Sequence, residues 1–530
     1  MTNPVVVLGG GINGAAIARQ LLINRQSVVL IDRYDIAFGA TAYSSRLIHG
    51  GLRYLEYAEL GLVRESLDER SRLLKLAPQF VKPLQLFIPS QSRFGGAATA
   101  TRNFLGWPIK QSDATPRGAW LVQAGLTMYD LFARASTLPK HRSRRFTDPE
   151  VPPVDPQRYR WMASYYDAQI RFPERFVVGM IQDCEALARQ HDVHFELLTY
   201  HDARREGSVI VAEPSLPYPS AKSRTFTPRA VVNATGAYVD QTLQTINVAS
   251  RRLMGGTKGS HLITFHPQLK QLLRNGGVYA EAEDGRPVFL LPFGDCCLIG
   301  TTDIFFDDDP AVASASDAEI DYLVSVINTI FPQTAFKRED VDCHYCGVRP
   351  LPYREAGQSA ASVTRNHILQ EHEVLLWPML SIIGGKLTTC RSLAEETVQW
   401  LAERLSFSIE DNGRDRPFKG CSDCRDVIDS VGAEKERSNE LLTGTDIPIS
   451  VVRTIIGNEH VRTVSDLVER RLMLLYERNL SERTILQLAE EMVAVGLLPS
   501  KPSRGKCMPV CNACKRCSGN GAMDKADRCH

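Results

Sequence analysis

The chain has 530 residues, of which 43% are hydrophobic and 23% are charged. This length predicts two or three domains with substantial cores, and the composition is ordinary for a soluble globular protein. The 62 basic and 61 acidic side chains leave a net charge of +1, so the total charge does not favour a nucleic-acid partner. Because no run of about 18 apolar residues is present, we expect no membrane-spanning helix.

The N-terminal stretch has the pattern of a dinucleotide-binding unit. Residues 5–8 read VVVL, which is typical of a buried parallel strand, and residues 9–14 read GGGING. The glycines of this G-x-G-x-x-G motif are Gly9, Gly11 and Gly14. They allow a tight turn, a close approach of the backbone to a pyrophosphate, and close packing of the following helix, whose N-terminus faces the phosphates. A second apolar strand over 28–31 ends at Asp32, whose carboxylate can accept hydrogen bonds from ribose hydroxyls.

The next elements alternate between helices and strands. Helical periodicity predicts helices over 60–78 and 172–190. Residues 193–198 predict a strand, and the apolar run at the start of 230–236 predicts a buried strand that ends in a small-residue turn. Shorter β-like runs between 255 and 345 indicate a separate, more antiparallel substrate domain.

The last third of the chain first returns to the opening pattern and then becomes helical. Residues 380–389 read LSIIGGKLTT, which predicts a strand, a glycine turn and a helix that belong to the first domain. Beyond residue 405, apolar faces around 464–475 and 485–492 predict a helical domain.

Cysteines are concentrated at the C-terminus. Five of the 13 cysteines lie in the last 24 residues, namely Cys507, Cys511, Cys514, Cys517 and Cys529. In a reducing compartment such spacing favours metal ligation over disulfides, and Cys421 and Cys424 could supply further ligands. Zinc, an iron–sulfur cluster and an unligated redox-sensitive tail remain open, and we assign no metal.

Five ordered motifs carry a family resemblance. Residues 45–56 read SRLIHGGLRYLE, and the later motifs are KGSH at 258–261, IGTTD at 299–303, GVRP at 347–350 and GGKLTT at 384–389. Together with the glycine-rich start, they make the chain resemble the FAD-dependent, quinone-linked glycerol-3-phosphate dehydrogenases. The helical region around residues 463–467 is similar to the C-terminal domain of that family, whereas the cysteine-rich tail departs from its simple members.

The resemblance implies an α/β fold with an FAD-binding Rossmann-type domain of the glycine-oxidase/D-amino-acid-oxidase kind, an α+β substrate domain and a helical C-terminal domain. The expected boundaries are 1–80, 160–255 and 345–402 for a discontinuous FAD-binding domain, 81–159 and 256–344 for a substrate or cap domain, 405–500 for the helical domain and 501–530 for the tail. A single G-x-G-x-x-G motif agrees with one flavin and no second site for a nicotinamide cofactor.

The resemblance also implies a reaction and a location. The expected reaction is oxidation of sn-glycerol 3-phosphate to dihydroxyacetone phosphate by hydride transfer to flavin N5, with electrons passed to a quinone or a respiratory partner. Because the N-terminus lacks the flanks of a signal peptide, we expect a cytoplasmic chain, peripherally associated with the inner face of the membrane. The sequence leaves open a homodimer, an FAD oxidase of another hydroxy acid or amine, and a redox-sensing flavoprotein.

Candidate site residues follow from the motifs. Arg349 is the first choice for the substrate phosphate, because a guanidinium binds phosphate through two parallel hydrogen bonds. By resemblance, Arg53, Tyr54, His49 and Lys386 lie in the same pocket. Removal of the hydroxyl proton requires a base, for which His49 and His261 are candidates, with Thr302 on the substrate side. The residues carried over for FAD are Ser45, Thr235, Gly236, Gly385, Lys386, Leu387 and Thr388, and a helix that begins near Leu387 is expected to point at the flavin O2.

Overall fold

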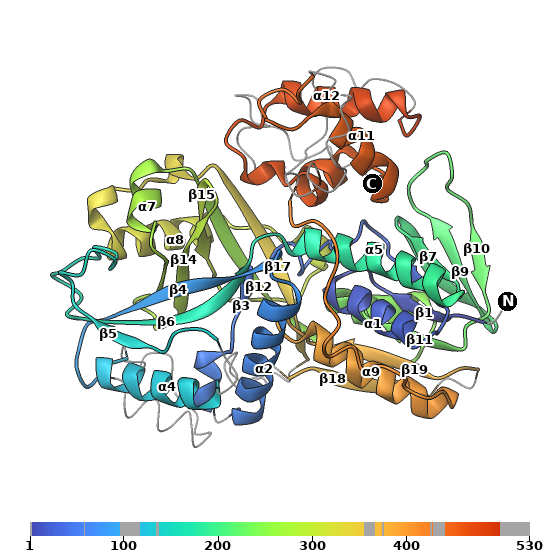
Figure 1. Ribbon diagram of the computed structural model, residues 1–530, viewed down its shortest axis with the longest axis horizontal. Helices are drawn as coiled ribbons and strands as arrows, with labels where there is room; N and C mark the ends of the chain where they lie inside the picture. The colour runs from blue at the N-terminus through green and yellow to red at the C-terminus, as the bar shows by residue number, and fades with distance from the viewer. Residues whose placement is uncertain are drawn as a thin grey trace.

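The computed structural model describes residues 3–57, 59–95, 117–133, 137–353, 366–373, 376–423, 427 and 440–498. It has three parts: a smaller sheet with its helices, a larger sheet with its helices, and a helical C-terminal part above both in the view of Figure 1. Within the described ranges, no helix is long and apolar enough to cross a membrane.

The smaller sheet contains the opening glycine motif. Its strand order is β18-β19-β11-β1-β2-β7, and every pair is parallel except the edge pair β18–β19. The strands are β1 (Val5–Leu8), β2 (Val28–Ile31), β7 (Phe195–Leu198), β11 (Ala230–Asn233), β18 (Ile368–His372) and β19 (Met379–Ile383). The strands predicted near residues 5, 28, 193, 230 and 380 are thus confirmed.

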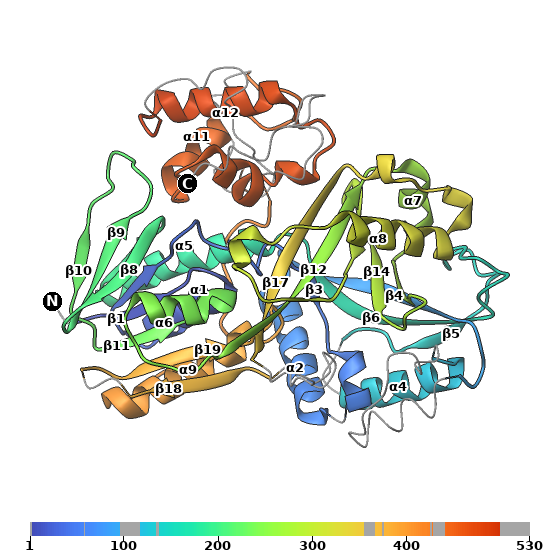
Figure 2. The same cartoon turned by 180° about the vertical axis from the view of Figure 1, so that it is seen from behind.

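Both faces of this sheet are covered, which explains why its strands are apolar at every position. Val5 and Val7 pack on one face against helices, while Val6 and Leu8 pack on the other. The helices of the first face are α1 (Ile12–Ile23), α5 (Pro173–His191) and α9 (Cys390–Leu405). The second face, seen from behind in Figure 2, is covered by α6 (Val239–Thr245) and by the three strands β8 (His201–Glu206), β9 (Val209–Pro214) and β10 (Arg224–Phe226).

The larger sheet has ten strands in its main path and side pairings. Its order is β16-β12-β15-β14-β13-β4-β6-β3, with β17 paired to β12 and β5 paired to β6. The strands are β3 (Leu47–Ile48), β4 (Val81–Ser90), β5 (Arg142–Arg144), β6 (Trp161–Ile170), β12 (Met254–Thr264), β13 (Gly277–Glu281), β14 (Pro287–Phe293), β15 (Cys296–Gly300), β16 (Ile304–Phe306) and β17 (Cys343–Pro352). Apart from the parallel pair β13–β4, all pairs are antiparallel, as expected for the substrate domain.

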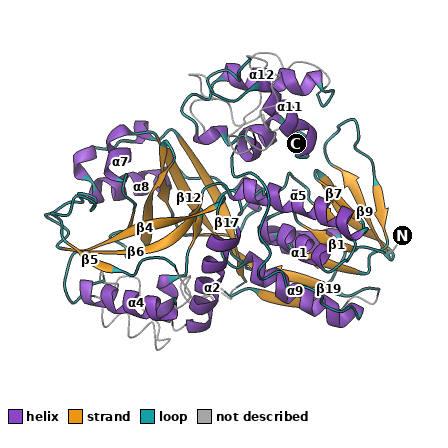
Figure 3. Ribbon diagram, viewed as in Figure 1, coloured by secondary structure: helices purple, strands orange, loops and turns teal. Residues whose placement is uncertain are grey.

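Helices cover both faces of the larger sheet, as Figure 3 shows by colour. On one face lie α2 (Leu60–Leu76) and α4 (Ala119–Phe132), and on the other lie α7 (Pro267–Leu272) and α8 (Asp317–Ile330). Neighbouring residues of one strand serve the two cores: Leu86 faces α2 and α4, whereas Phe87 faces α7 and α8. This alternation is the two-residue period of a strand with both faces buried.

The boundary between the two sheets differs from the expected one. Strand β6 and all but the first two residues of β17 fall inside ranges expected for the FAD-binding domain, yet both strands pair within the larger sheet, β6 with β4 and β17 with β12. Each pairing extends over ten residues. An apolar run identifies a buried strand but contains no information on which sheet the strand joins, because that depends on its partner elsewhere in the chain.

The C-terminal part is helical, as predicted. It contains α11 (Ile449–Asn458), a π-helix over Asp466–Arg471, and α12 (Glu482–Ala494), which the Ser481 side chain caps. Its apolar side chains, among them Leu467 and Leu488, join the same core as α2 and α4. The predicted tail ligands Cys507 to Cys529, together with Cys424, lie outside the described residues; within the described part, no group of three metal-ligating side chains occurs.

Candidate cofactor and active site

A cavity of about 710 Å³ lies at the carboxyl ends of the parallel strands and extends to the larger sheet. Such a crevice, outside the ends of parallel strands, is where α/β sheets bind their ligands. Fourteen of the predicted residues line it: Gly9, Gly11, Asp32, Ser45, His49, Tyr54, Thr235, Gly236, His261, Arg349, Gly385, Lys386, Leu387 and Thr388. Gly14 and Thr302 do not line it, and the side chain of Arg53 is outside the described set.

The glycine motif forms a cradle that has no room for side chains. Gly9 has a φ of +102°, and a Cβ there would lie 2.7 Å from the carbonyl oxygen of Ala234. A Cβ on Gly14 would lie 1.8 Å from the carbonyl oxygen of Gly9, so α1 packs directly on the turn. The backbone therefore approaches the cavity closely at the N-terminus of α1, as a pyrophosphate requires.

Asp32 lies beside this cradle at the end of β2. Its carboxylate accepts hydrogen bonds from the backbone N–H groups of Gly10, at 2.5 Å, and Tyr34, at 2.8 Å. Burial raises the pKa of Asp32 to about 7, although these two hydrogen bonds act in the opposite direction. The carboxyl group keeps acceptor capacity for ribose hydroxyls in the cavity.

The second glycine turn brings residues from the far end of the chain to the same cavity. Gly384 and Gly385 have φ values of +83° and +92°, and a Cβ on Gly385 would lie 2.4 Å from Nδ2 of Asn13. The helix after the turn begins at Cys390 and not near Leu387, which corrects the predicted start of that helix. Residues 386–388 therefore line the cavity as an extended turn that precedes the helix.

Arg349 is held by four oxygens at the end of the cavity that borders the larger sheet. Nη1 donates to Asp303 Oδ1 at 2.9 Å and to Thr257 Oγ1 at 3.2 Å. Nη2 donates to Thr301 Oγ1 at 2.9 Å and to the carbonyl oxygen of Thr302 at 3.0 Å. These contacts fix the plane of a guanidinium that borders the cavity.

Lys386, Tyr54 and His49 form a second group at this end. The Lys386 ammonium lies 4.1 Å from the centroid of the Tyr54 ring, and the His49 ring lies 6.1 Å from the same ring, centroid to centroid. The cation over the aromatic face stabilises this arrangement. Arg349 and Lys386 therefore give the cavity two cationic side chains from segments that are far apart in sequence.

His261 is almost fully buried. Its Nε2 lies 2.9 Å from Ser45 Oγ, its ring stacks on Tyr345 at 4.9 Å, and its Nδ1 has no hydrogen-bond partner. Burial, together with the charges of Arg349 and Arg46, lowers the pKa of His261 to about 3. His261 is therefore neutral at physiological pH, and its residue borders the cavity.

A pH titration of stability tests the neutral state of His261. The unfolded histidine gains a proton near its usual pKa of 6.5, whereas the folded one gains it only near 3. The contribution of neutral His261 to the free energy of unfolding is thus complete above pH 6.5. It is lost as the pH falls towards 3, at up to about 1.4 kcal/mol per pH unit. We expect His261→Gln to lose stability less steeply over this range in urea unfolding. Parallel curves for the two proteins would contradict the assignment.

Thr302 points away from the cavity. Its Oγ1 donates to Glu319 Oε1 at 2.7 Å and accepts from the Ser260 N–H at 2.8 Å, while its carbonyl oxygen accepts from Arg349. The geometry therefore gives Thr302 an indirect role, since it orients Arg349 from behind. The sequence shows two adjacent threonines, Thr301 and Thr302, but it does not show which of their hydroxyl groups faces the cavity.

Thr302→Val tests this indirect role. The substitution keeps the shape but leaves the Ser260 N–H and the Glu319 carboxylate without this partner, at a cost of about 1–3 kcal/mol. We expect a roughly 3- to 10-fold higher KM for a phosphorylated substrate with a smaller change in kcat, because loss of the hydroxyl contacts loosens the Thr302 backbone whose carbonyl oxygen accepts from Arg349. Thr454→Val, which removes a hydroxyl that forms an exposed hydrogen bond to the Ser450 carbonyl oxygen within α11, is the control. An unchanged KM in both variants would contradict the role.

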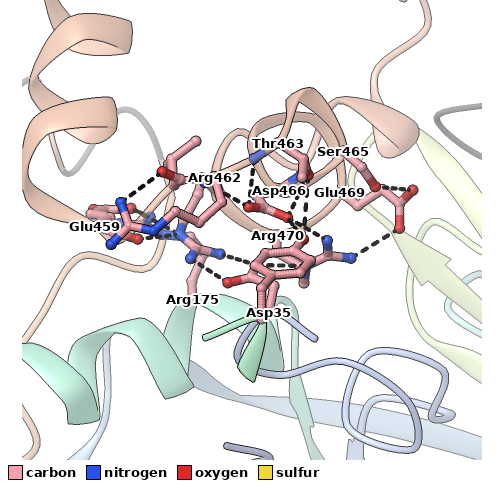
Figure 4. Close-up of polar contacts among 12 residues, drawn as sticks. Asp35, Arg175, Glu459, Arg462, Thr463, Ser465, Asp466, Glu469 and Arg470 are labelled. Atoms are coloured by element: carbon pink, nitrogen blue, oxygen red, sulfur yellow. Dashed lines mark hydrogen bonds and ion pairs between the residues drawn. The ribbon is translucent and has the colours of Figure 1, made fainter. Parts of the chain in front are cut away.

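The C-terminal part contributes residues that the sequence did not predict for the site. Ser465 and Glu469 of this part line the cavity. Burial raises the pKa of Glu469 to about 7. Around them, arginines and carboxylates form the polar network of Figure 4. The available signal was the charged run over residues 469–471 within an otherwise apolar helical segment, because buried charges need partners from another segment.

The comparisons with known proteins agree with this geometry. Residues 4–389 match the family described as FAD dependent oxidoreductase (DAO). The chain is 36% identical over 432 residues to a glycerol-3-phosphate dehydrogenase of Synechocystis sp., covering 76% of this chain and 70% of the relative. It is 32% identical over 426 residues to a D-erythritol 1-phosphate dehydrogenase of Brucella abortus, covering 79% and 77%.

A solved structure supports the fold. The glycerol-3-phosphate dehydrogenase of Bacillus halodurans, in complex with FAD, superimposes with a TM-score of 0.66 at 19% identity, over 95% of this chain and 93% of the other. The expected α/β fold class and the expected cofactor FAD are thus confirmed. The glycine cradle, Asp32 and a cavity of this volume fit a dinucleotide. Gly9, Gly11, Asp32 and Thr235 would hold its adenosine and pyrophosphate parts, and Ser45 and residues 385–388 would hold its flavin.

Proposed function

Because the chain belongs to the FAD-dependent glycerol-3-phosphate dehydrogenase family, we propose that it oxidises sn-glycerol 3-phosphate to dihydroxyacetone phosphate. The observation that supports this best is Arg349, whose guanidinium is held by Asp303, Thr257 and Thr301 at the edge of the cofactor cavity. A fixed guanidinium suits a phosphate monoester better than an uncharged substrate. When bound, FAD supplies the two-electron acceptor for the alcohol.

The side chains near Arg349 provide the remaining functions. Arg349 and Lys386 balance the substrate's negative charge, and Tyr54 lies beneath Lys386. The hydroxyl proton requires a base, and His261 is the poorer candidate because burial lowers its pKa to about 3. We therefore assign the base to His49 and a hydrogen-bonding role to His261. Arg53 is kept in the pocket by resemblance alone.

A longer polyol phosphate is the second candidate substrate. The Brucella relative is named for D-erythritol 1-phosphate and is nearly as similar as the relative named for glycerol 3-phosphate. Arg349 also borders a second cavity of about 380 Å³, lined among others by Asp307 and Arg252, so extra hydroxyl groups could find polar partners beyond it. Both substrates share the phosphate monoester and the secondary alcohol.

A membrane quinone is the proposed electron acceptor, reached by peripheral contact with a membrane. The support is an exposed aromatic group in which Phe94 stacks on Trp120, at 71% and 57% exposure. The Arg93 guanidinium lies over both rings and also over Trp161. Aromatic rings beside a cation suit the interface of an anionic bilayer. Dimerisation has no comparable support.

Anaerobic flavin reduction tests the proposed function. Addition of glycerol 3-phosphate to the FAD-loaded protein is expected to bleach the flavin absorbance near 450 nm, and a quinone analogue is expected to restore it. Glycerol and lactate, which lack the phosphate, are the controls. Reduction by D-erythritol 1-phosphate alone would select the second substrate. An oxidised flavin after both phosphates, with reduction by lactate or glycine, would reject the proposal.

A further inference from the structure

Asp35 is a fully buried carboxylate between the cofactor domain and the C-terminal part. Arg471 binds it through both terminal nitrogens, at 2.8 and 2.9 Å, and Arg470 Nε lies 2.7 Å from the same carboxylate. Figure 4 shows Asp35 reaching up to the helix that carries Arg470. Although burial alone would raise the pKa of Asp35, the two arginines hold it below its usual value. Asp35 is therefore an ionised anchor with no exposure to solvent.

Two carboxylates of the same helix bond to Arg470, and a backbone carbonyl outside the helix bonds to Arg471. Arg470 Nη2 donates to Asp466 Oδ1 at 2.9 Å and Nη1 donates to Glu469 Oε2 at 3.2 Å. Arg471 Nε donates to the carbonyl oxygen of Glu459 at 2.9 Å. Each charged side chain of this network has a partner of opposite charge. Removal of one of them leaves a buried charge without compensation, which destabilises a protein more than removal of both partners does.

Asp35 belongs to a loop whose residues before and after Asp35 line the cofactor cavity. Residues 32–34 and 38–41 border the cavity, while Asp35 points away from it. The loop also touches the glycine cradle, since the Ala37 N–H donates to the carbonyl oxygen of Gly10 and Thr41 Oγ1 accepts from the Ile12 N–H. A shift of Asp35 therefore moves the wall of the cavity and the start of α1 together.

Two further contacts attach the C-terminal part around the same cavity. The Tyr200 hydroxyl donates to Asp466 at 2.6 Å, and the Tyr200 N–H donates to the carbonyl oxygen of Tyr34 in the lining loop. At the other end, Arg46 Nη2 donates to the Tyr476 hydroxyl at 2.5 Å and to the carbonyl oxygen of Ala42 at 3.0 Å. The C-terminal part thus contacts the lining loop and its neighbours at separate positions, near Tyr34 and near Ala42.

We propose that the C-terminal helical part is a structural component of the FAD site. Arg470 and Arg471 act through Asp35 as positioning residues: they hold the loop over residues 33–45 in the conformation that receives FAD. Ser465 and Glu469 complete the wall of the same cavity. Docking of this part and binding of FAD are consequently coupled, so that each strengthens the other by the same factor. This coupling depends on the cofactor and not on the identity of the substrate.

The test compares two buried ion pairs of the full-length chain. Asp35→Asn removes the anchor, and Asp183→Asn removes the partner of Arg19, a 2.6 Å buried pair between α1 and α5 that does not line the cavity. The apoprotein of each variant is titrated with FAD, and the quenching of flavin fluorescence gives the Kd. We expect at least a 10-fold higher Kd for Asp35→Asn and less than a 3-fold change for Asp183→Asn, with both melting temperatures lowered. Equal Kd values for the two variants would overturn the proposal.

Two further measurements keep the test decisive if Asp35→Asn does not fold. Tyr200→Phe removes only the hydroxyl that reaches Asp466, and we expect it to raise the FAD Kd about 2- to 4-fold. Hydrogen exchange of the wild-type apoprotein requires no substitution. Addition of FAD is expected to slow exchange of the segment 462–476 as well as of residues 33–45. Slower exchange of residues 33–45 alone would show that the C-terminal part is a separate unit and would reject the coupling.

Discussion

Replacement of Arg349 by lysine is expected to raise the KM for glycerol 3-phosphate at least about 100-fold while the affinity for FAD stays within 2-fold. Lysine keeps the positive charge but loses the planar guanidinium, which meets two phosphate oxygens by exchanging protein contacts of its two terminal nitrogens for them. It also loses the simultaneous contacts with Asp303 and Thr301 that fix the side chain. Loss of about two charge-assisted hydrogen bonds corresponds to the expected factor, at roughly 1.5–3 kcal/mol each. Steady-state kinetics with a quinone analogue gives the KM.

Arg338→Lys is the matched control for this substitution. Arg338 lies in the same domain and pairs with Asp317 and Asp321 on the surface, where such pairs contribute little. We expect its kinetics to equal those of the wild type. If Arg349→Lys left the KM unchanged, Arg349 would have no role in phosphate binding, even if glycerol 3-phosphate remained the substrate. Flavin titration separates this outcome from loss of the cofactor.

Gly14→Ala is expected to abolish retention of FAD and to destabilise the fold by at least about 3 kcal/mol. The added Cβ would lie 1.8 Å from the carbonyl oxygen of Gly9 and 3.0 Å from its carbonyl carbon. Since the obstacle is backbone and not a flexible side chain, α1 has to move away from the turn that faces the pyrophosphate. The flavin-to-protein absorbance ratio after purification and urea unfolding measure the two effects.

Gly61→Ala is the control for Gly14→Ala, because both replace a helical glycine. Gly61 lies in the first turn of α2 with no atom within 4 Å of an added Cβ. We expect normal FAD content and unchanged or slightly higher stability, as alanine favours a helix over glycine by about 1 kcal/mol. A Gly14→Ala protein with full FAD content would mean that the cradle tolerates a shift of α1.

The features that could be predicted from sequence are those that depend on residues close together in the chain. The run from residue 5 to Asp32 contains its strand, turn, helix and second strand in one continuous stretch, and the structure confirms each of them. The motifs around His49, Arg349 and Lys386 indicated a shared pocket through the family resemblance, and these three side chains line one cavity. Local pattern and recognisable motifs suffice for such features.

The features that the sequence did not determine depend on distant segments. Thr302 was expected to face the substrate, but its hydroxyl bonds to Glu319 of α8, and only the packing of that helix decides this. The strands β6 and β17 joined the larger sheet because their pairing partners lie there. The helix after Gly385 starts three residues later than predicted, since residues 387–389 complete a turn first.

The sequence alone determined that this chain binds a dinucleotide at its N-terminus, and with its motifs it determined the FAD-dependent family. That the C-terminal part borders the same cavity could be seen only in the folded chain, because the partners Asp35 and Arg470 are 435 residues apart. A glycine turn takes its shape from its own backbone, and the local sequence specifies that backbone. A buried charge acts through whichever segment neutralises it, and that segment is known only once the chain has folded.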